Sequence, residues 1–214
     1  MTTIDVEFSE QDISDVKSML SGIKDGAATA IMRAINQGLS TGKTQGAKEV
    51  GQIYTLKSSR IKKDFDMRKA TKAELSGSVW ATGEPVGLLN FSANKVNAGY
   101  SVKVLKSGGR SVLKHAFKAK TRKARKDGTT YETEHLWWRS YDGPRSGSGT
   151  TFVGYFGGLP SGHKFRDPIE RLEGPRIEDA LSRPEVLAKV QDAASEKMQS
   201  KLATETYNLL RRYG

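Results

Sequence analysis

Apolar positions in the first quarter of the chain recur every three or four residues, which predicts helices. A short apolar stripe over residues 10–23 follows Ser9 and Asp12, a pair typical of a helix start. After a break at Gly26, a longer stripe continues for many turns over residues 27–53. The sequence therefore predicts a short helix followed by one long helix.

Three glycines lie four residues apart on the predicted long helix, at Gly38, Gly42 and Gly46. Each lowers helix propensity by roughly 1 kcal/mol relative to alanine. Close approach of another backbone, either within the subunit or from a neighbouring subunit, would compensate for this cost. The alternative is a helix that simply tolerates its glycines. Gly42 and Gly46 are therefore candidates for a subunit interface.

Beyond the long helix the pattern changes from helical to alternating. Thr55 can cap a third helix over residues 56–69, which has a strongly basic face. Alternate residues then become apolar over 73–81, with Trp80 on the opposite side, and a return strand is predicted over 86–91.

A second hairpin and a closing helix complete the pattern. Residues 100–105 and 110–118 alternate around a glycine-containing loop, which predicts a hairpin in one of two registers that differ by one residue. A short aromatic strand is predicted over 152–156. The last helix follows Pro184, which suits a first helical turn, and carries an apolar stripe with a mostly charged remainder.

This order of elements predicts an α+β fold. It consists of N-terminal helices including one long helix, a mostly antiparallel sheet of four to five strands, and a C-terminal helix packed on the sheet. Residues 1–214 are expected to form a single domain. Residues 120–149 are polar, basic and rich in glycine and serine, and we expect them to form an insertion or interface loop.

Composition argues against several kinds of active site. The chain has no cysteine, which excludes disulfides, thiol nucleophiles and cysteine-bound zinc. Its three histidines, His115, His135 and His163, are scattered without the spacing of metal ligands. Thr41-Gly42-Lys43-Thr44 contains the end of a phosphate-loop motif, but the preceding glycine is one residue too close and no strand precedes it.

No catalytic set emerges from the remaining polar residues. The carboxylates of residues 170–179 interleave with arginines, as in ion pairs at a subunit contact or on a solvated face. Gly147-Ser148-Gly149 lacks the strand-turn-helix context of a serine nucleophile. We therefore predict no catalytic, cofactor-binding or metal-binding residues, and no enzymatic activity.

The formal net charge of +11 favours a polyanionic partner such as nucleic acid, anionic lipid or an acidic protein, although lysine-rich surfaces also aid solubility. No secretory signal opens the sequence. No apolar run approaches the ~20 residues that span a bilayer, so no membrane association is predicted.

One dense run of cations stands out near the middle of the chain, closely followed by Tyr131 and the pair Trp137-Trp138. The run comprises Lys118, Lys120, Arg122, Lys123, Arg125 and Lys126. It could bind DNA without sequence preference or contact an acidic partner, and a solvated loop is the alternative. Two adjacent tryptophans cannot face the same side of a strand, so one of them should meet solvent or a neighbour.

Several segments, in this order, resemble the phage minor tail protein Z and tail completion family. They are AATAIMRAINQGLSTGKTQGAKEV, LKSSRIKKDFDMRKAT, ELSGSVWATGEPVGLLNF, GGRSVLKHAFKAK, TTFVGYF, DPIERLEGP and LATETYNLLRR, which together cover nearly the whole chain. Each segment alone has low specificity, whereas their order is much harder to obtain by chance.

The resemblance implies a structural virion protein in the head-proximal neck region of a phage tail, assembled in the host cytoplasm. Such a protein would complete the tail and support head-tail joining through protein contacts, as a homo-oligomeric ring for which tail symmetry suggests a hexamer. Its partners would be the tail terminator, the head-tail connector, and the tail tube or tape measure. Candidate interface residues are Gly42, Gly46, Trp137, Trp138, Pro168, Ile169, Arg171, Gly174, Pro175 and Arg176. Sequence-independent DNA binding through residues 118–126 is the alternative function.

Overall fold

The computed structural model describes residues 3–6, 8–139 and 169–213. Helices and antiparallel strands are both present, which confirms the α+β class. Where the sequence predicted one domain, the chain divides into two compact units. The helical unit consists of residues 1–53, 57–84 and 176–214, and the strand unit consists of residues 54–56 and 85–175.

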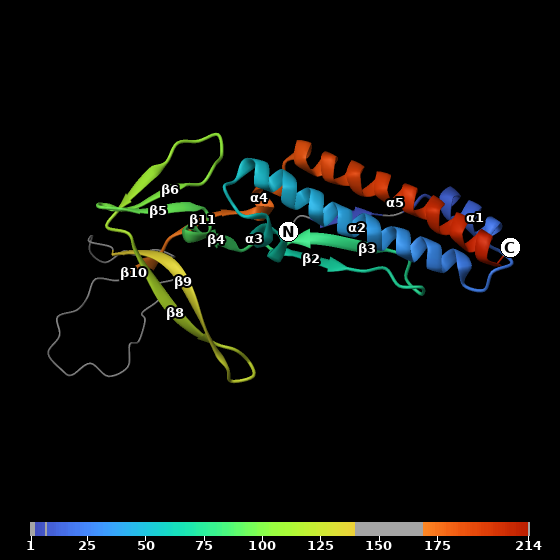
Figure 1. Ribbon diagram of the computed structural model, residues 1–214, viewed down its shortest axis with the longest axis horizontal. Helices are drawn as coiled ribbons and strands as arrows, with labels where there is room; N and C mark the ends of the chain where they lie inside the picture. The colour runs from blue at the N-terminus through green and yellow to red at the C-terminus, as the bar shows by residue number, and fades with distance from the viewer. Residues whose placement is uncertain (1–2, 7, 140–168, 214) are drawn as a thin grey trace. The chain divides into compact units, whose positions relative to one another are not determined.

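The helical unit contains five helices and one small sheet in its described part (Figure 1). The helices are α1 (Glu10–Met19), α2 (Gly26–Ile53), α3 (Ser58–Lys63), α4 (Ile177–Leu181) and α5 (Pro184–Tyr213). The strands are β1 (Thr3–Val6), β2 (Phe65–Arg68) and β3 (Gly77–Ala81), in the order β1-β3-β2. Both long helices, α2 and α5, occur where the apolar stripes predicted them.

The strand unit contains three small sheets in its described part, of which the two three-stranded sheets are antiparallel. The first has the order β5-β6-β7, from β5 (Ser92–Val96), β6 (Gly99–Lys103) and β7 (Ser111–Lys114). The second has the order β10-β9-β8, from β8 (Phe117–Ala124), β9 (Thr130–Arg139) and β10 (Ile169–Arg171). The third pairs β4 (Pro85–Gly87) with β11 (Glu173–Arg176), and the 3₁₀ turn η1 (Leu88–Asn90) follows β4.

The glycine face of α2 is filled by other parts of the same unit. A Cβ atom at Gly38 would lie 3.0 Å from the carbonyl oxygen of Ala194 on α5, and one at Gly42 would lie 3.5 Å from the Cβ of Ala194. A Cβ at Gly46 would lie 3.1 Å from Cζ of Phe65. The prediction that Gly42 and Gly46 form a subunit interface is therefore wrong, because α5 and β2 already occupy this face.

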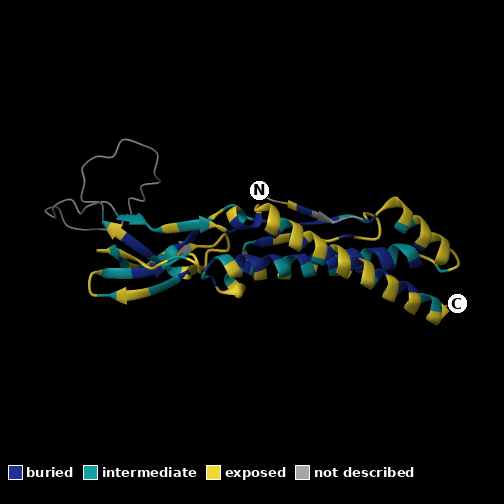
Figure 2. Cartoon of the chain, turned by 90° about the horizontal axis from the view of Figure 1, so that it is seen from above, coloured by how far each residue is buried: buried dark blue, intermediate teal, exposed yellow. Residues whose placement is uncertain are grey.

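The resulting core follows the length of α2, where α5 lies alongside it, and Figure 2 shows it as the band of buried residues on α2. Fully buried side chains of α2 include Ile31, Ile35 and Leu39, and α5 contributes Val190 and Ala194. The closing helix thus packs chiefly on α2, rather than across a sheet as predicted.

The third helix, predicted over residues 56–69, ends at Lys63, and residues 65–68 form strand β2 instead. Phe65 is buried at the start of β2 and pairs with Ala81 of β3, while Asp66 is exposed. Alternating burial with a strand partner therefore overrides the helical spacing of Phe65 and Ile61. Burial of Phe65 against Gly46 of α2 supplies the driving force.

The single sheet of four to five strands is replaced by four small sheets. β3 pairs with β1 and β2 instead of a return strand over 86–91, and β4 pairs with β11. In the second predicted hairpin, Tyr100 pairs with Leu113, which selects one of the two registers left open. The aromatic strand predicted over 152–156 lies outside the described residues.

Candidate functional site

The two units differ sharply in formal charge. The strand unit has 16 Lys and Arg residues against 7 Asp and Glu residues, a net charge of +9. The helical unit has 19 against 17, a net charge of +2. Within the strand unit, no Asp or Glu occurs from Pro85 to Lys126, whereas this stretch contains 11 Lys and Arg residues. Most of the chain's excess positive charge therefore belongs to the strand unit.

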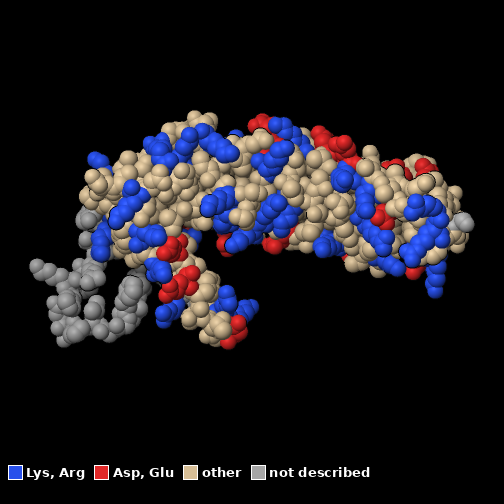
Figure 3. Space-filling model, in the orientation of Figure 1, with Lys and Arg blue, Asp and Glu red and all other residues tan. Residues whose placement is uncertain are grey.

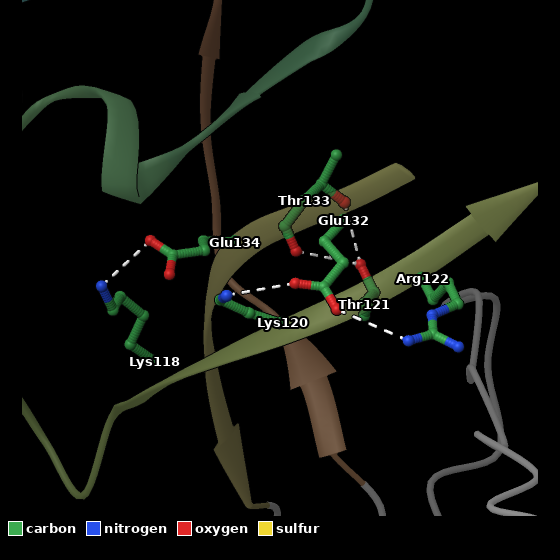
Figure 4. A network of polar contacts seen from close by, with 7 residues as sticks. All are labelled: Lys118, Lys120, Thr121, Arg122, Glu132, Thr133 and Glu134. Atoms are coloured by element: carbon green, nitrogen blue, oxygen red, sulfur yellow. Dashed lines mark hydrogen bonds and ion pairs between the residues drawn. The ribbon is translucent and has the colours of Figure 1, made fainter. Parts of the chain in front are cut away.

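The predicted basic run lies largely on the β8–β9 hairpin, so part of the segment predicted as an insertion is regular structure. Cross-strand pairing sets Lys120 opposite Glu134 and Arg122 opposite Glu132, on one face of the ribbon. Figure 4 shows the resulting ion pairs: Lys118 with Glu134 at 2.9 Å, Lys120 with Glu132 at 3.1 Å, and Arg122 with Glu132 at 3.7 Å. Three of the six predicted DNA-contacting cations therefore already have carboxylate partners.

These pairs affect the titration of both partners. The hydrogen bond and the charge of Glu132 raise the pKa of the Lys120 ammonium, and the same contact lowers the pKa of Glu132. Both side chains are exposed, so the pairing organises the face without burying charge. On the opposite face, the hydroxyls of Thr121 and Thr133 lie 3.0 Å apart.

The rest of the basic run lies at the tip of the hairpin. The guanidinium of Arg125 lies over the Tyr131 ring at 5.2 Å from its centroid, and Lys126 is exposed. Asp127 accepts hydrogen bonds from the hydroxyl and the backbone N–H of Thr129, which lower the pKa of its carboxyl. The placement of the Lys123 side chain lies outside what the structure describes.

The two adjacent tryptophans take opposite environments. Trp137 is only 5% exposed and meets His135 edge-to-face, with ring centroids 6.2 Å apart. Trp138 is 37% exposed, and its Nε1 donates a hydrogen bond to Glu170 on β10 at 3.1 Å. Trp137 therefore belongs to the core of the strand unit, while Trp138 remains available for an interface.

The other predicted interface residues also divide between interior and surface. Gly174 is half-buried, and a Cβ there would lie 2.7 Å from the Phe91 ring, so this glycine packs against Phe91 of the same unit. Ile169 and Arg171 are half-buried on β10, at the edge of its sheet, and Arg171 pairs with Glu173 at 3.3 Å. Pro175 and Arg176 lie at the end of β11, where the Arg176 N–H donates a hydrogen bond to Asp179 as α4 begins. Pro168 lies outside the described residues.

Sequence reasoning missed a second basic surface, on the sheet β5-β6-β7. Arg110, in the loop before β7, donates four hydrogen bonds across β5 and β6. Its acceptors are the Oγ and carbonyl oxygen of Ser92 at 3.0 and 2.9 Å, and the Oγ and carbonyl oxygen of Ser101 at 3.1 and 2.9 Å. All four acceptors are neutral, so the guanidinium charge is held in place without being cancelled.

Lys103 and Lys114 share that face with Arg110. Strand pairing sets Lys103 opposite Ser92 and Lys114 opposite Gly99, in line with Ser101. Within the described part of the chain, no carboxylate forms an ion pair with Lys103, Arg110 or Lys114. In Figure 3 the surface over β5 and β6 shows Lys and Arg but no Asp or Glu. The absence of acids from residues 85–126 was the sequence signal for this surface.

The helical unit has a separate polar hollow of about 480 Å³ between α2 and α5. Its lining includes Glu205, which is 7% exposed and accepts hydrogen bonds from Arg33 at 2.8 Å and pairs with Lys201 at 2.7 Å. The hydrogen bond from Lys201, followed by that from Arg33, lowers the pKa of Glu205. This carboxylate neutralises cations from both helices, so the hollow is chiefly a structural ion-pair site.

Among the described residues, no three His, Asp or Glu side chains are grouped in a way that could hold a metal ion. No helix in the described ranges has the length and apolar character needed to cross a membrane. Comparison with known proteins found no matching family model, no matching curated protein and no matching solved structure.

Proposed function

We propose that this chain is a structural protein of a phage tail that completes the head-proximal end of the tail and supports head-tail joining. The observation that carries the proposal is the order of seven segments that resemble the tail completion family, from the alanine-rich long helix to LATETYNLLRR. The protein would act by ring assembly and protein contacts, without catalysis.

The surface features of the strand unit support contacts of this kind. Trp138 exposes an aromatic ring, and exposed tryptophans are frequent energetic centres of interfaces. Among the described strands, β10 and β8 lie at the edges of their sheet, and edge strands can pair with another chain. A head-to-tail contact through these edges would generate a ring if the rotation that relates neighbouring subunits returns to the first subunit.

The mass of the protein in solution tests this proposal. Light scattering on the full chain, alone and with candidate tail and neck proteins, should detect a ring or a monomer that assembles with a partner. Trp138→Ala should raise the protein concentration required for assembly at least tenfold, because it removes a contact residue. Tyr207→Ala, which removes another exposed aromatic on α5, is the matched control and should assemble normally. A protein that stays monomeric with every neck partner would contradict the proposal.

A second candidate function is sequence-independent DNA binding. The net charge of +9 in the strand unit favours it, because neutralising phosphates releases counterions and gives salt-sensitive affinity. Binding of wild-type protein to a random-sequence duplex at low salt, weakening steeply as salt rises, would support this function.

A further inference from the structure

We propose that the face of the sheet β5-β6-β7 that carries Arg110, Lys103 and Lys114 binds the phosphate backbone of double-stranded DNA. We call this face the Arg110 face. The inference rests on the second candidate function, DNA binding, and assigns it to a different surface from the cation run that the sequence suggested.

The strand register places Lys103 and Lys114 on the same face of the sheet, four residues apart along the strand direction. Lys103 on β6 and Lys114 on β7 project from the same side of the sheet as Ser101, across which Arg110 lies. Lys106 in the β6–β7 loop is exposed at the end of this sheet. Lys114 pairs with Gly99, four residues from Lys103, so at about 3.3 Å per residue the two lysines lie roughly 13 Å apart along the strands and could contact different phosphates of one backbone.

Arg110 is pre-organised for an external anion. Its four hydrogen bonds to Ser92 and Ser101 fix the guanidinium over the sheet before any ligand arrives. Less side-chain freedom is then lost on binding. Because its acceptors are neutral, the full positive charge remains to attract a phosphate.

The β8–β9 hairpin is a weaker phosphate site, although its sequence is more basic. Lys118, Lys120 and Arg122 would have to exchange Glu132 and Glu134 for phosphate oxygens. The two carboxylates would also remain beside the bound DNA and repel it. The Arg110 face has no such competing acid among the described residues.

The chemistry of the Arg110 face favours a nucleic-acid backbone over an acidic protein. Its exposed polar residue Asn94 belongs to the types that contact phosphates along with Lys and Arg. Cores of protein interfaces are instead depleted in lysine and enriched in aromatic residues. Val112, 52% exposed, is the apolar residue paired opposite Ser101 on this face, which offers no aromatic ring on which bases could stack.

Two matched triple variants of the full chain test this inference. Lys103→Gln, Lys106→Gln and Lys114→Gln together remove the two lysines of the Arg110 face and Lys106 in the loop beside it. Lys118→Gln, Lys120→Gln and Arg122→Gln remove three paired cations from the hairpin. Binding to a labelled 30-base-pair random duplex is measured by fluorescence anisotropy over a range of salt concentrations. Thermal unfolding followed by circular dichroism checks that both variants fold.

The Arg110-face variant should bind at least tenfold more weakly at low salt, and its salt dependence should fall by roughly two to three units of slope, near 0.9 per phosphate contact. The hairpin variant should stay within about threefold of wild type. The charge-conserving substitutions Lys103→Arg, Lys106→Arg and Lys114→Arg should leave binding intact.

Three results would overturn the inference, and they differ from one another. If wild-type protein does not bind the duplex at low salt, the DNA-binding function itself fails. If wild type binds but the hairpin variant loses as much affinity as the Arg110-face variant, or more, DNA binding stands and the assigned face is wrong. If a polyglutamate peptide binds through the Arg110 face and the duplex does not, the partner is an acidic protein.

Discussion

The helical unit has more buried hydrophobic residues and less net charge than the strand unit. Of the 32 buried hydrophobic residues in the described part of the chain, 24 belong to the helical unit and 8 to the strand unit. The net charges, counted over all residues of each unit, run the other way, at +2 and +9. Hydrophobic burial dominates folding stability, whereas unbalanced surface charge attracts partners and repels itself. The comparison suggests that the helical unit provides the scaffold and the strand unit provides the contacts.

Truncating one leucine in each unit, fully buried in the helical unit and half-buried in the strand unit, should give the largest difference in stability. Leu39→Ala empties a fully buried position on α2 and should lower the free energy of unfolding by roughly 2–5 kcal/mol. Leu113→Ala, at a half-buried position on β7, should cost about 1 kcal/mol or less. Urea unfolding followed by circular dichroism measures both. Equal losses would show that the half-buried position on β7 contributes as much to stability as the buried position on α2, which would contradict this expectation.

A smaller effect is expected from filling the glycine face of α2. Gly38→Ala places a Cβ 3.0 Å from the Ala194 carbonyl oxygen and 3.1 Å from the Met198 Cβ. We expect a net loss of about 1–2 kcal/mol, because crowding against α5 outweighs the gain in helix propensity. Gly51→Ala is the control on the same helix, since its nearest neighbour would be Ile61 at 3.6 Å. The free energy of unfolding of Gly51→Ala, measured by thermal or urea unfolding, should rise by up to about 1 kcal/mol. A similar rise for Gly38→Ala would show that close packing of α5 does not require a glycine at position 38.

The smallest effect concerns the buried carboxylate that links α2 to α5. Glu205→Gln should lower the free energy of unfolding at pH 7 by about 1 kcal/mol, because Arg33 and Lys201 remain partly exposed to water that screens the pairs. The pKa of Glu205 is lowered in the fold, so its contribution is present above the ordinary value of 4.5 and is lost as pH falls below it. Urea midpoints at pH 7 and pH 3 should therefore differ more for wild type than for Glu205→Gln. Glu196→Gln, at an exposed position on α5, should behave as wild type, and an unchanged pH response in Glu205→Gln would contradict this role.

The sequence predicted the elements whose signals are local and long. The apolar stripes of α2 and α5 extend over many turns, and both helices occur at the expected residues. Strand partners depend on contacts distant in sequence, so neither the pairing of β3 with β1 and β2 nor that of β4 with β11 could be obtained from alternation alone. Phe65 fitted the helical stripe predicted over residues 56–69, but in the structure it begins β2 and packs against Gly46 of α2, a contact that is distant in sequence.

The candidate site was predictable in composition but not in placement. Counting cations identified the run at residues 118–126, but only the strand register revealed that Glu132 and Glu134 pair with part of it. Arg110 gave no motif in the sequence, because its role depends on Ser92 and Ser101, which come from two different strands. A search for stretches free of acidic residues would have located the surface, though not its geometry.

The most direct test of this division of roles is lysine acetylation footprinting of the full chain, read by mass spectrometry, with and without a 30-base-pair duplex. The account predicts that DNA protects Lys103, Lys106 and Lys114 of the strand unit, while the exposed Lys189 and Lys197 on α5 keep their reactivity. Protection of the α5 lysines, or protection confined to Lys118 and Lys120 of the hairpin, would contradict it.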